Sequence, residues 1–309
     1  MAKQYTSSLM MVRPASFQFN IETAQSNAFQ QQLEGLSKEE IKCKAIEEFD
    51  AYVEKLREHK IDVTVIQDTP NPAKPDAIFP NNWISMHADG TIYLFPMCTA
   101  NRRLEIRPEI IKEIETKFVV NKVDNMSALA NDKLFLEGTG SIIFDHIHRK
   151  AYACISPRTD KKLLEEFCLK IGYQAITFTS VDLQNKLVYH TNVMLTIGDT
   201  FAIICLESIR DEGERELVKQ HLANSGHDII DITFEQMQSF AGNMLQVQNT
   251  DGKTYVVMSE TALDSLTATQ IKQIEMHTAI LSVEIPTIET IGGGSARCML
   301  AEIFLKEKN

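Results

Sequence analysis

The chain has 309 residues, of which 44% are hydrophobic, and this is enough to build a large globular core. Lys and Arg total 31 against 42 Asp and Glu, and the formal net charge of −11 disfavours nucleic acids and anionic lipids as partners. The first residues lack a secretory signal pattern, and no apolar run approaches the roughly 18 residues that span a bilayer. We therefore expect a cytoplasmic protein with no membrane or nucleic-acid partner.

Short apolar runs, typical of strands, alternate along the chain with amphipathic segments, typical of helices. No linker or low-complexity tract divides the chain, so we expect a single domain of mixed α/β structure over residues 1–309. The predicted strands are 8–12, 63–66, 92–95, 141–144, 151–155, 201–205 and 255–258. The predicted helices are 37–59, 159–171, 209–224 and 262–277.

A turn containing a small residue or an asparagine recurs beside apolar runs along the chain. With positions 82, 138, 192, 243 and 298 as anchors, the spacings are 56, 54, 51 and 55 residues. Such a period is typical of a repeat in which each unit buries its apolar face against its neighbours. It predicts a five-bladed α/β propeller with the anchors at its centre, although anchors this loose could also match by chance.

Cys298 follows a glycine run in the segment Ile291-Gly-Gly-Gly-Ser-Ala-Arg-Cys298. Glycines let backbone N–H groups approach a ligand without a Cβ atom in the way, and the adjacent cation Arg297 favours the thiolate. This setting favours a reactive nucleophile over a buried hydrophobic thiol, which is the usual state of a lone cysteine. Cys154 and Cys205 lie in strand-like runs and are predicted to be core thiols.

His190 lies in the apolar run 187–195, which is predicted to be a strand. Beside a nucleophilic thiol it would transfer protons, and the alternative is a hydrogen-bonded core histidine. Glu137 follows three apolar residues and precedes Gly138, so its carboxylate should point to one defined place. There it would orient an imidazole or a substrate amide, and the alternative is a surface turn.

Asn81 and Asn82 follow an X-Pro turn beside the only tryptophan, and either substrate contacts or ordinary turn chemistry would explain them. Arg102 and Arg158 are candidate forks for a carboxylate, with solvated surface arginines as the alternative. His146 and His148 flank Ile147 in a predicted turn and show no carboxylate spacing typical of a metal site. We therefore expect no metal.

Seven segments occur together over nearly the whole chain in an order that resembles the amidinotransferase and arginine deiminase-related (pentein) hydrolases. Within them, the resemblance is nearest to the citrulline-utilisation hydrolase group. It implies a five-bladed α/β propeller and a Cys/His/Glu site without metal or organic cofactor. The segments are Met11-Val-Arg-Pro14, Asp76-Ala-Ile-Phe-Pro-Asn-Asn82, Asn101-Arg-Arg103, Leu136-Glu-Gly138, Ser156-Pro-Arg-Thr159, His190-Thr-Asn192 and Gly292-Gly-Gly-Ser-Ala-Arg-Cys298.

The resemblance also implies roles for individual residues. Cys298 would be the nucleophile, His190 the general acid and base, and Glu137 its acidic partner. The remaining candidates would bind a small amino-acid substrate: Arg102 and Arg158 its carboxylate, Asp76 its amino-acid end, and Asn82 and Asn192 its reacting group, with Asn81 as a further substrate-binding candidate. A homodimer is compatible with the resemblance.

Two positions depart from the family pattern. Arginine deiminases and dimethylarginine hydrolases have aspartates where this chain has Asn82 and Asn192. Because a buried guanidinium requires opposite charge and a neutral ureido group requires both donors and acceptors, the asparagines favour citrulline, hydrolysed to ornithine, ammonia and carbon dioxide. The alternatives are hydrolysis of arginine or a methylated arginine, amidino transfer, and a non-catalytic binding protein of the same fold.

Overall fold

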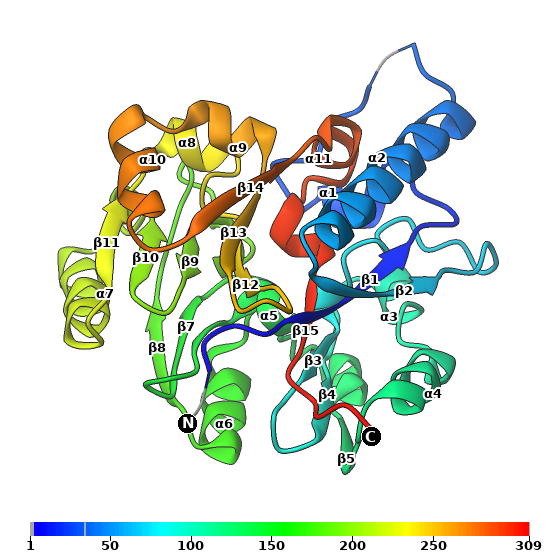
Figure 1. Ribbon diagram of the computed structural model, residues 1–309, viewed down its shortest axis with the longest axis horizontal. Helices are drawn as coiled ribbons and strands as arrows, with labels where there is room; N and C mark the ends of the chain where they lie inside the picture. The colour runs from blue at the N-terminus through cyan, green and yellow to red at the C-terminus, as the bar shows by residue number, and fades with distance from the viewer. Residues whose placement is uncertain (1–2, 34, 309) are drawn as a thin grey trace. The chain divides into compact units, whose positions relative to one another are not determined.

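The computed structural model of the protein describes residues 3–33 and 35–308 (Figure 1). The chain divides into two compact units, each assembled from separate stretches. Unit 1 comprises Met1–Tyr5, Thr139–Glu284 and Ser295–Arg297, and unit 2 comprises Thr6–Gly138, Ile285–Gly294 and Cys298–Asn309. That the whole chain acts as one domain stays a prediction.

The strands of both units fall into groups of three with one pairing scheme, in which the first two strands are antiparallel and the last two are parallel. Unit 1 contains three such groups: β6 (Ile143–Asp145), β7 (Lys150–Cys154) and β8 (Gln174–Phe178); β9 (Leu195–Ile197), β10 (Phe201–Ile204) and β11 (Asp228–Asp231); β12 (Leu245–Gln248), β13 (Thr254–Ser259) and β14 (Ala279–Val283).

Unit 2 contains two groups: β15 (Ala301–Ile303), β1 (Ser8–Arg13) and β2 (Asp62–Gln67); β3 (Ile84–Met86), β4 (Thr91–Leu94) and β5 (Lys122–Asn125). β15, near the C-terminus, runs antiparallel beside β1, near the N-terminus (Figure 1). A pairing between Ile303 and Met86 joins both groups into one six-stranded sheet.

Each of the five anchor residues lies two to five residues before the first strand of a group. Four of them lie in short helical turns, namely η1 (Pro80–Asn82), α5 (Gly138–Ser141), η3 (Thr191–Val193) and η5 (Ala296–Met299). Asn243 occupies the same place before β12 without a helix. The predicted repeat of five units is therefore present in the strand pairing, whereas the arrangement of these groups as a five-bladed propeller remains a prediction.

The helices confirm three of the four predicted segments. They are α1 (Ile21–Ala24), α2 (Lys38–Glu58), α3 (Ala100–Arg103), α4 (Pro108–Lys117), α6 (Lys161–Ile171), α7 (Glu212–Asn224), α8 (Phe234–Gln238), α9 (Glu260–Ser265), α10 (Ala268–Glu275) and α11 (Pro286–Gly292), with further single turns η2 (Ser127–Asp132) and η4 (Leu206–Ser208). The single helix predicted at 262–277 is wrong. Thr267 forms a capping box with Gln270, and this cap starts α10 as a separate helix.

The core of each unit forms where apolar strand faces meet the buried faces of helices. In unit 2, α2 packs on β1, β2 and α11 through Ile41, Ala45, Phe49, Tyr52 and Leu56. In unit 1, α6 packs on β8, and α7 packs on β8 and β11. Within the described residues, no helix is long and apolar enough to cross a membrane.

Candidate active site

Every predicted site residue is at most 3% exposed. Charged side chains are rarely buried to this extent unless they are paired, so a solvated surface role is wrong for Glu137, Arg102 and Arg158. Unit 2 holds Asp76, Asn81, Asn82, Arg102, Glu137 and Cys298, and unit 1 holds Arg158, His190 and Asn192.

In unit 2, Cys298 lies in η5, shortly after a helix that ends in glycines. Gly293 adopts a left-handed conformation with φ of 60° and closes α11 by donating its N–H to the Glu289 carbonyl at 2.9 Å. A Cβ atom on Gly292 would lie 2.7 Å from the Phe79 ring, and one on Gly294 would lie 3.1 Å from it. The glycines thus end the helix and admit Phe79, and the Gly293 N–H serves the helix end instead of a ligand.

The segment before α2 fixes the end of α11. The Asn27 amide donates to the Gly293 carbonyl at 3.1 Å, the Gln30 amide donates to the Ile291 carbonyl at 3.2 Å, and the Gln31 N–H donates to the Thr290 carbonyl at 2.7 Å. Carbonyls in the last turn of a helix lack partners within the helix, so these three donors hold the approach to Cys298 in one conformation.

Arg102 makes a network of buried hydrogen bonds. It donates to both carboxylate oxygens of Glu105 at 2.8 and 2.9 Å, and to the Phe79 carbonyl at 3.0 Å. Its Nη1 donates to Asn82 Oδ1 at 2.7 Å. Much of the fork predicted to bind a substrate carboxylate is therefore engaged by Glu105 and Asn82, and the clamp role stays a prediction.

The Asn82 side chain has a defined polarity because arginine has donors and no acceptors. Its oxygen must face Arg102, so its Nδ2 faces away. Nδ2 is buried and makes no hydrogen bond to the described residues. Asn82 thus keeps one buried hydrogen-bond donor that is not used within the described residues.

Glu137 is fully buried, and its Oε1 accepts the N–H of Cys98 at 2.9 Å. The next residue, Gly138, has φ of +45°, and a Cβ atom there would overlap the Asn81 carbonyl and lie 2.9 Å from the Asn82 carbonyl. Glycine is therefore required, and Glu137 is held against the turn that carries both asparagines.

Three buried carboxylates act on Arg102. Burial lowers the pKa of Arg102, but Glu105, with Asp76 and Glu137, outweighs it and raises that pKa above its ordinary value. Burial raises the pKa of Glu105 to about 7, although Arg102 opposes the rise and Asp76 and Glu137 add to it. The carboxylates around Arg102 therefore hold its guanidinium in the charged form.

Asp76 is held by neutral donors. Its Oδ2 accepts from the Asn20 amide at 2.7 Å and the Thr23 hydroxyl at 3.0 Å, and Asn101 donates to Asn20 Oδ1 at 2.7 Å. A cavity of about 390 Å³, within the size range of small-ligand sites, is lined by residues that include Asn20, Asn101 and Pro75. It therefore adjoins Asp76.

In unit 1, the His190 ring lies 4.6 Å from the Tyr189 ring, between centroids, in a tilted arrangement, and the Arg158 guanidinium lies 4.8 Å over the same Tyr189 ring. Asn243 Nδ2 donates to the Asn192 carbonyl at 2.8 Å. His190 has extended backbone angles and directly precedes η3. The prediction of a strand over 187–195 is wrong, because this helical turn interrupts the run and β9 begins at Leu195.

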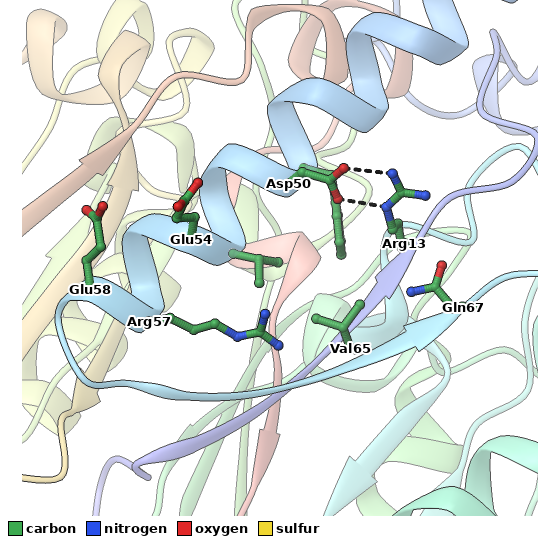
Figure 2. Close-up of a pocket in the computed structure, with 9 residues that line it drawn as sticks. Arg13, Asp50, Glu54, Arg57, Glu58, Val65 and Gln67 are labelled. Atoms are coloured by element: carbon green, nitrogen blue, oxygen red, sulfur yellow. Dashed lines mark hydrogen bonds and ion pairs between the residues drawn. The ribbon is translucent and has the colours of Figure 1, made fainter.

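Three buried cysteines, one surface hollow and one polar cluster lie outside the predicted active site. Burial raises the pKa of Cys154, Cys168 and Cys205 to about 12, which suits core thiols and confirms that prediction for Cys154 and Cys205. A hollow of about 720 Å³ lies between α2 and the strands β1 and β2, beside the paired Arg13 and Asp50, and no predicted site residue lines it (Figure 2). Among the described residues, Asp145, His148 and His227 could hold a metal ion.

Sequence reasoning missed Glu105 and Asn20. Glu105 lies three residues after Arg102, a spacing that brings opposite charges together on a helical turn and could have revealed the pair. Asn20 reaches Asp76 from 56 residues away, and no local pattern marks that contact.

The family model for eukaryotic N,N-dimethylarginine dimethylhydrolases matches residues 13–305. Solved structures with a similar fold include apo ArgZ, an arginine dihydrolase from the ornithine-ammonia cycle in cyanobacteria, with a TM-score of 0.73 and 14% identity; the match covers 96% of this chain and 40% of that one. A variant of AgrE with L-arginine gives a TM-score of 0.74 and 15% identity, covering 98% and 41%.

A dimethylarginine dimethylaminohydrolase variant, as an adduct with S-methyl-L-thiocitrulline, gives a TM-score of 0.63 and 16% identity, covering 98% of this chain and 100% of that one. This chain thus spans about two fifths of the ArgZ and AgrE chains and the full length of the third. No curated protein sequence matches this chain.

Proposed function

Because the chain belongs to the eukaryotic N,N-dimethylarginine dimethylhydrolase family of pentein hydrolases, we propose that it hydrolyses the side-chain guanidino group of free arginine through the ureido stage to ornithine. Arginine and two waters would yield ornithine, carbon dioxide and two ammonia molecules. Citrulline, the substrate expected from the sequence, would enter the same reaction at its second half. The complexes of similar folds with L-arginine or a thiocitrulline support this choice of substrate class.

The observation that carries the proposal is the polarity of Asn82. Arg102 fixes the Asn82 oxygen at 2.7 Å, and the buried Nδ2 remains as a donor. A donor stabilises the oxygen of a ureido group, or the oxyanion that forms when water or thiolate attacks it. An aspartate in its place would repel that oxygen, so Asn82 supports hydrolysis that continues past the ureido stage.

Charge in unit 2 supports entry of the guanidinium cation. Asp76, Glu105 and Glu137 are three buried carboxylates that act on Arg102. A buried cation is costly unless opposite charge compensates it, and in this proposal Asp76 and Glu137 supply compensation that Asn82 lacks. The cavity next to Asp76 has a size that suits the amino-acid end of the substrate.

In the proposed mechanism, the Cys298 thiolate attacks the guanidinium carbon, and His190 protonates the nitrogen that leaves as ammonia. Water activated by His190 then attacks the S-bound carbon and displaces the thiolate, which leaves a bound ureido group that Cys298 attacks a second time. Expulsion of the second ammonia leaves a thiocarbamate on Cys298, and a second water releases ornithine and carbon dioxide. Glu137 would orient the reacting nitrogens, while Arg158 and Asn192 would contact the substrate.

Product analysis tests this proposal. Purified protein is incubated in parallel with arginine, citrulline and dimethylarginine, and ornithine, citrulline, ammonia and dimethylamine are quantified. We expect ornithine and ammonia in a 1:2 ratio from arginine, roughly as the mechanism requires. If citrulline accumulates without ornithine, the protein carries out only the first hydrolysis of arginine and is a deiminase.

Hydrolysis of dimethylarginine is the second candidate, because the matching family model describes that activity. Dimethylamine released from dimethylarginine faster than ammonia from arginine would establish it in place of the first proposal. A protein with no turnover of the three substrates would favour a non-catalytic binding role.

A further inference from the structure

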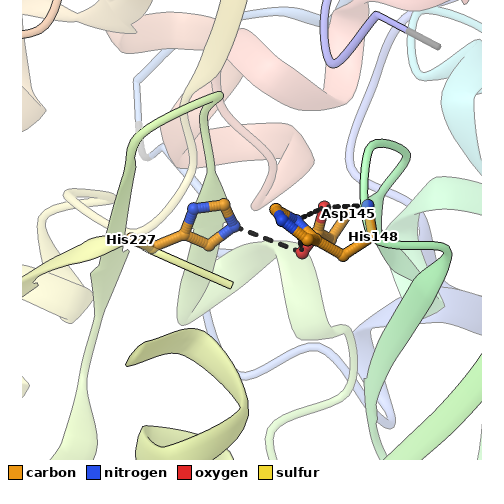
Figure 3. Close-up of side chains that lie close together, drawn as sticks. All are labelled: Asp145, His148 and His227. Atoms are coloured by element: carbon orange, nitrogen blue, oxygen red, sulfur yellow. Dashed lines mark hydrogen bonds and ion pairs between the residues drawn. The ribbon is translucent and has the colours of Figure 1, made fainter. Parts of the chain in front are cut away.

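A histidine-aspartate cluster lies in unit 1, outside the residues assigned to hydrolysis. Asp145 ends β6, His148 lies in the following turn, and His227 lies in the loop between α7 and β11 (Figure 3). One ligand atom from each residue lies within 4.8 Å of the other two. The sequence interpretation, which found no carboxylate spacing typical of a metal site at His146 and His148, is wrong for His148, since Asp145 stands three residues before it and bonds to it.

The three side chains converge on a common point. Asp145 Oδ1 lies 2.9 Å from His148 Nδ1, and Asp145 Oδ2 lies 3.3 Å from His227 Nε2. The two imidazole rings are 5.8 Å apart between centroids and nearly perpendicular. In tetrahedral zinc sites with bonds of about 2.0–2.2 Å, neighbouring ligand atoms lie roughly 3.3–3.6 Å apart. Small side-chain shifts would therefore bring this group into coordination geometry.

His227 supplies an independent observation. Its side chain has no exposed surface, and neither ring nitrogen makes a well-aligned hydrogen bond to the described residues. A buried polar group without a hydrogen bond is costly, and a metal ion would give Nε2 a strong partner. Asp145 is likewise buried, whereas His148 is 36% exposed and opens the group to solvent.

The positively charged side chain of Lys150 does not bond to the Asp145 carboxylate. Lys150 pairs with Asp145 across β6 and β7, but its ammonium donates to the His221 carbonyl at 2.9 Å and the Ser225 hydroxyl at 2.8 Å. The Asp145 carboxylate therefore faces the two imidazoles, while the Lys150 ammonium is bonded elsewhere.

We propose that Asp145, His148 and His227 form a binding site for a divalent transition metal, with Zn²⁺ as the best match. Two imidazoles and one carboxylate suit zinc, whereas calcium and magnesium prefer oxygen ligands alone. Three protein ligands leave a fourth position for water on the exposed side of His148. The ion would join the β6–β7 turn to the loop that follows α7.

Zinc titration of metal-free protein against a competing indicator tests the site. We expect one zinc ion bound to the wild type, at least about 10-fold weaker binding in His148→Asn, and no change in His146→Asn. His148 is exposed, so its variant should fold. Because Cys298 could also bind zinc, the titration is repeated on Cys298→Ser, which should bind like the wild type.

A cobalt spectrum identifies the ligands without reference to turnover. Co²⁺ bound at this site should show visible d–d bands without sulfur charge transfer, and Asp145→Asn should weaken them. Unchanged zinc affinity in His148→Asn, an equal loss in His146→Asn, or a loss in Cys298→Ser would overturn the proposal. None of these readouts depends on the substrate proposed for the enzyme.

Discussion

At the scale of residues, hydrogen bonds decide what the predicted site can recognise. Asn82 alone could present either end of its amide, but Arg102 takes the oxygen and leaves the donor end unused. Glu105 in turn fixes Arg102 through two hydrogen bonds. Glu105, which was not predicted as a site residue, thus determines through Arg102 which end of the Asn82 amide is free of hydrogen bonds to the arginine.

Asn82→Asp should change substrate preference. One carboxylate oxygen would stay with Arg102, and the other would repel a ureido oxygen while attracting a guanidinium. We expect citrulline turnover to fall about 10-fold or more, the cost of a mismatched polar contact of roughly 1–3 kcal/mol. Arginine binding should be kept or improved, and adding Asn192→Asp should extend the shift.

Initial rates with citrulline, arginine competition and melting temperature would be measured on the same preparations. Asn121→Asp is the control, since Asn121 donates to the Asp89 carbonyl in an exposed loop. Equal loss for both substrates together with a lower melting temperature would mean that Asn82 only holds its turn.

Cys298→Ser should lower turnover by about 10⁴-fold or more, because a hydroxyl is a far weaker nucleophile than a thiolate. The free energy of unfolding should change by no more than about 1 kcal/mol, as the two side chains are nearly isosteric. The control is Cys43→Ser, which alters an exposed thiol on α2. Steady-state rates and urea unfolding check both points, and activity retained in Cys298→Ser would remove this thiol from the mechanism.

The buried Glu105 should make stability depend on pH. Its pKa of about 7 in the folded protein exceeds the ordinary value of 4.5, so the folded state binds more protons between these values. The free energy of unfolding should therefore fall as the pH rises from about 4.5 to about 7. Urea unfolding at several pH values should show this fall in the wild type and a smaller one in Glu105→Gln. The exposed Glu109→Gln should retain the wild-type slope, and equal slopes in all three proteins would contradict the prediction.

At the scale of elements, short helical turns before the first strands place the predicted residues. Asn82 ends η1, His190 precedes η3 and Cys298 lies in η5. Each turn lies just before a strand that is itself held in a β-sheet by its neighbours. Tight backbone packing around these turns is therefore as important as the side chains for the geometry of the predicted site.

Gly138→Ala should disturb η1 and the position of Glu137. The new Cβ atom would overlap the Asn81 carbonyl on a backbone with positive φ. We expect a loss of about 2 kcal/mol or more in stability, together with a large loss of activity. Gly252→Ala is the matched control, because Gly252 also has positive φ but its Cβ would have no neighbour closer than 3.9 Å. It should cost about 1 kcal/mol without affecting turnover, and equal effects on activity would contradict the packing argument.

At the scale of the whole molecule, the path of the chain links the two units. The chain crosses between them five times, after Tyr5, Gly138, Glu284, Gly294 and Arg297. Strand β1 pairs with β15 from the opposite end of the chain, so unit 2 is complete only when both ends are present. Neither unit is one continuous stretch.

Calorimetry should therefore show one cooperative unfolding transition, with agreement between calorimetric and van't Hoff enthalpies. This would support the predicted single domain of 309 residues. Two separated transitions would instead show that the units unfold independently. Cys298→Ser should leave the number of transitions unchanged and serves as the control.

The sequence by itself determined the family motifs, the candidate thiol and the position of every anchor before a strand group, because each depends on local residue order. It also indicated the long helices, whose buried faces repeat every three to four residues. Periodicity was less informative for strands of three or four residues and for the break at Thr267, where a side-chain cap overrides a continuous amphipathic pattern.

Only the tertiary structure decided which polar groups meet. Asn20 lies 56 residues before Asp76 in the sequence, and Asp145 lies 82 residues before His227. The glycines before Cys298 end a helix and pack on Phe79, a role that depends on a neighbour more than 200 residues earlier in sequence. Long-range contacts form because buried polar groups require partners and buried backbones require space, and local sequence specifies neither the partner nor the space.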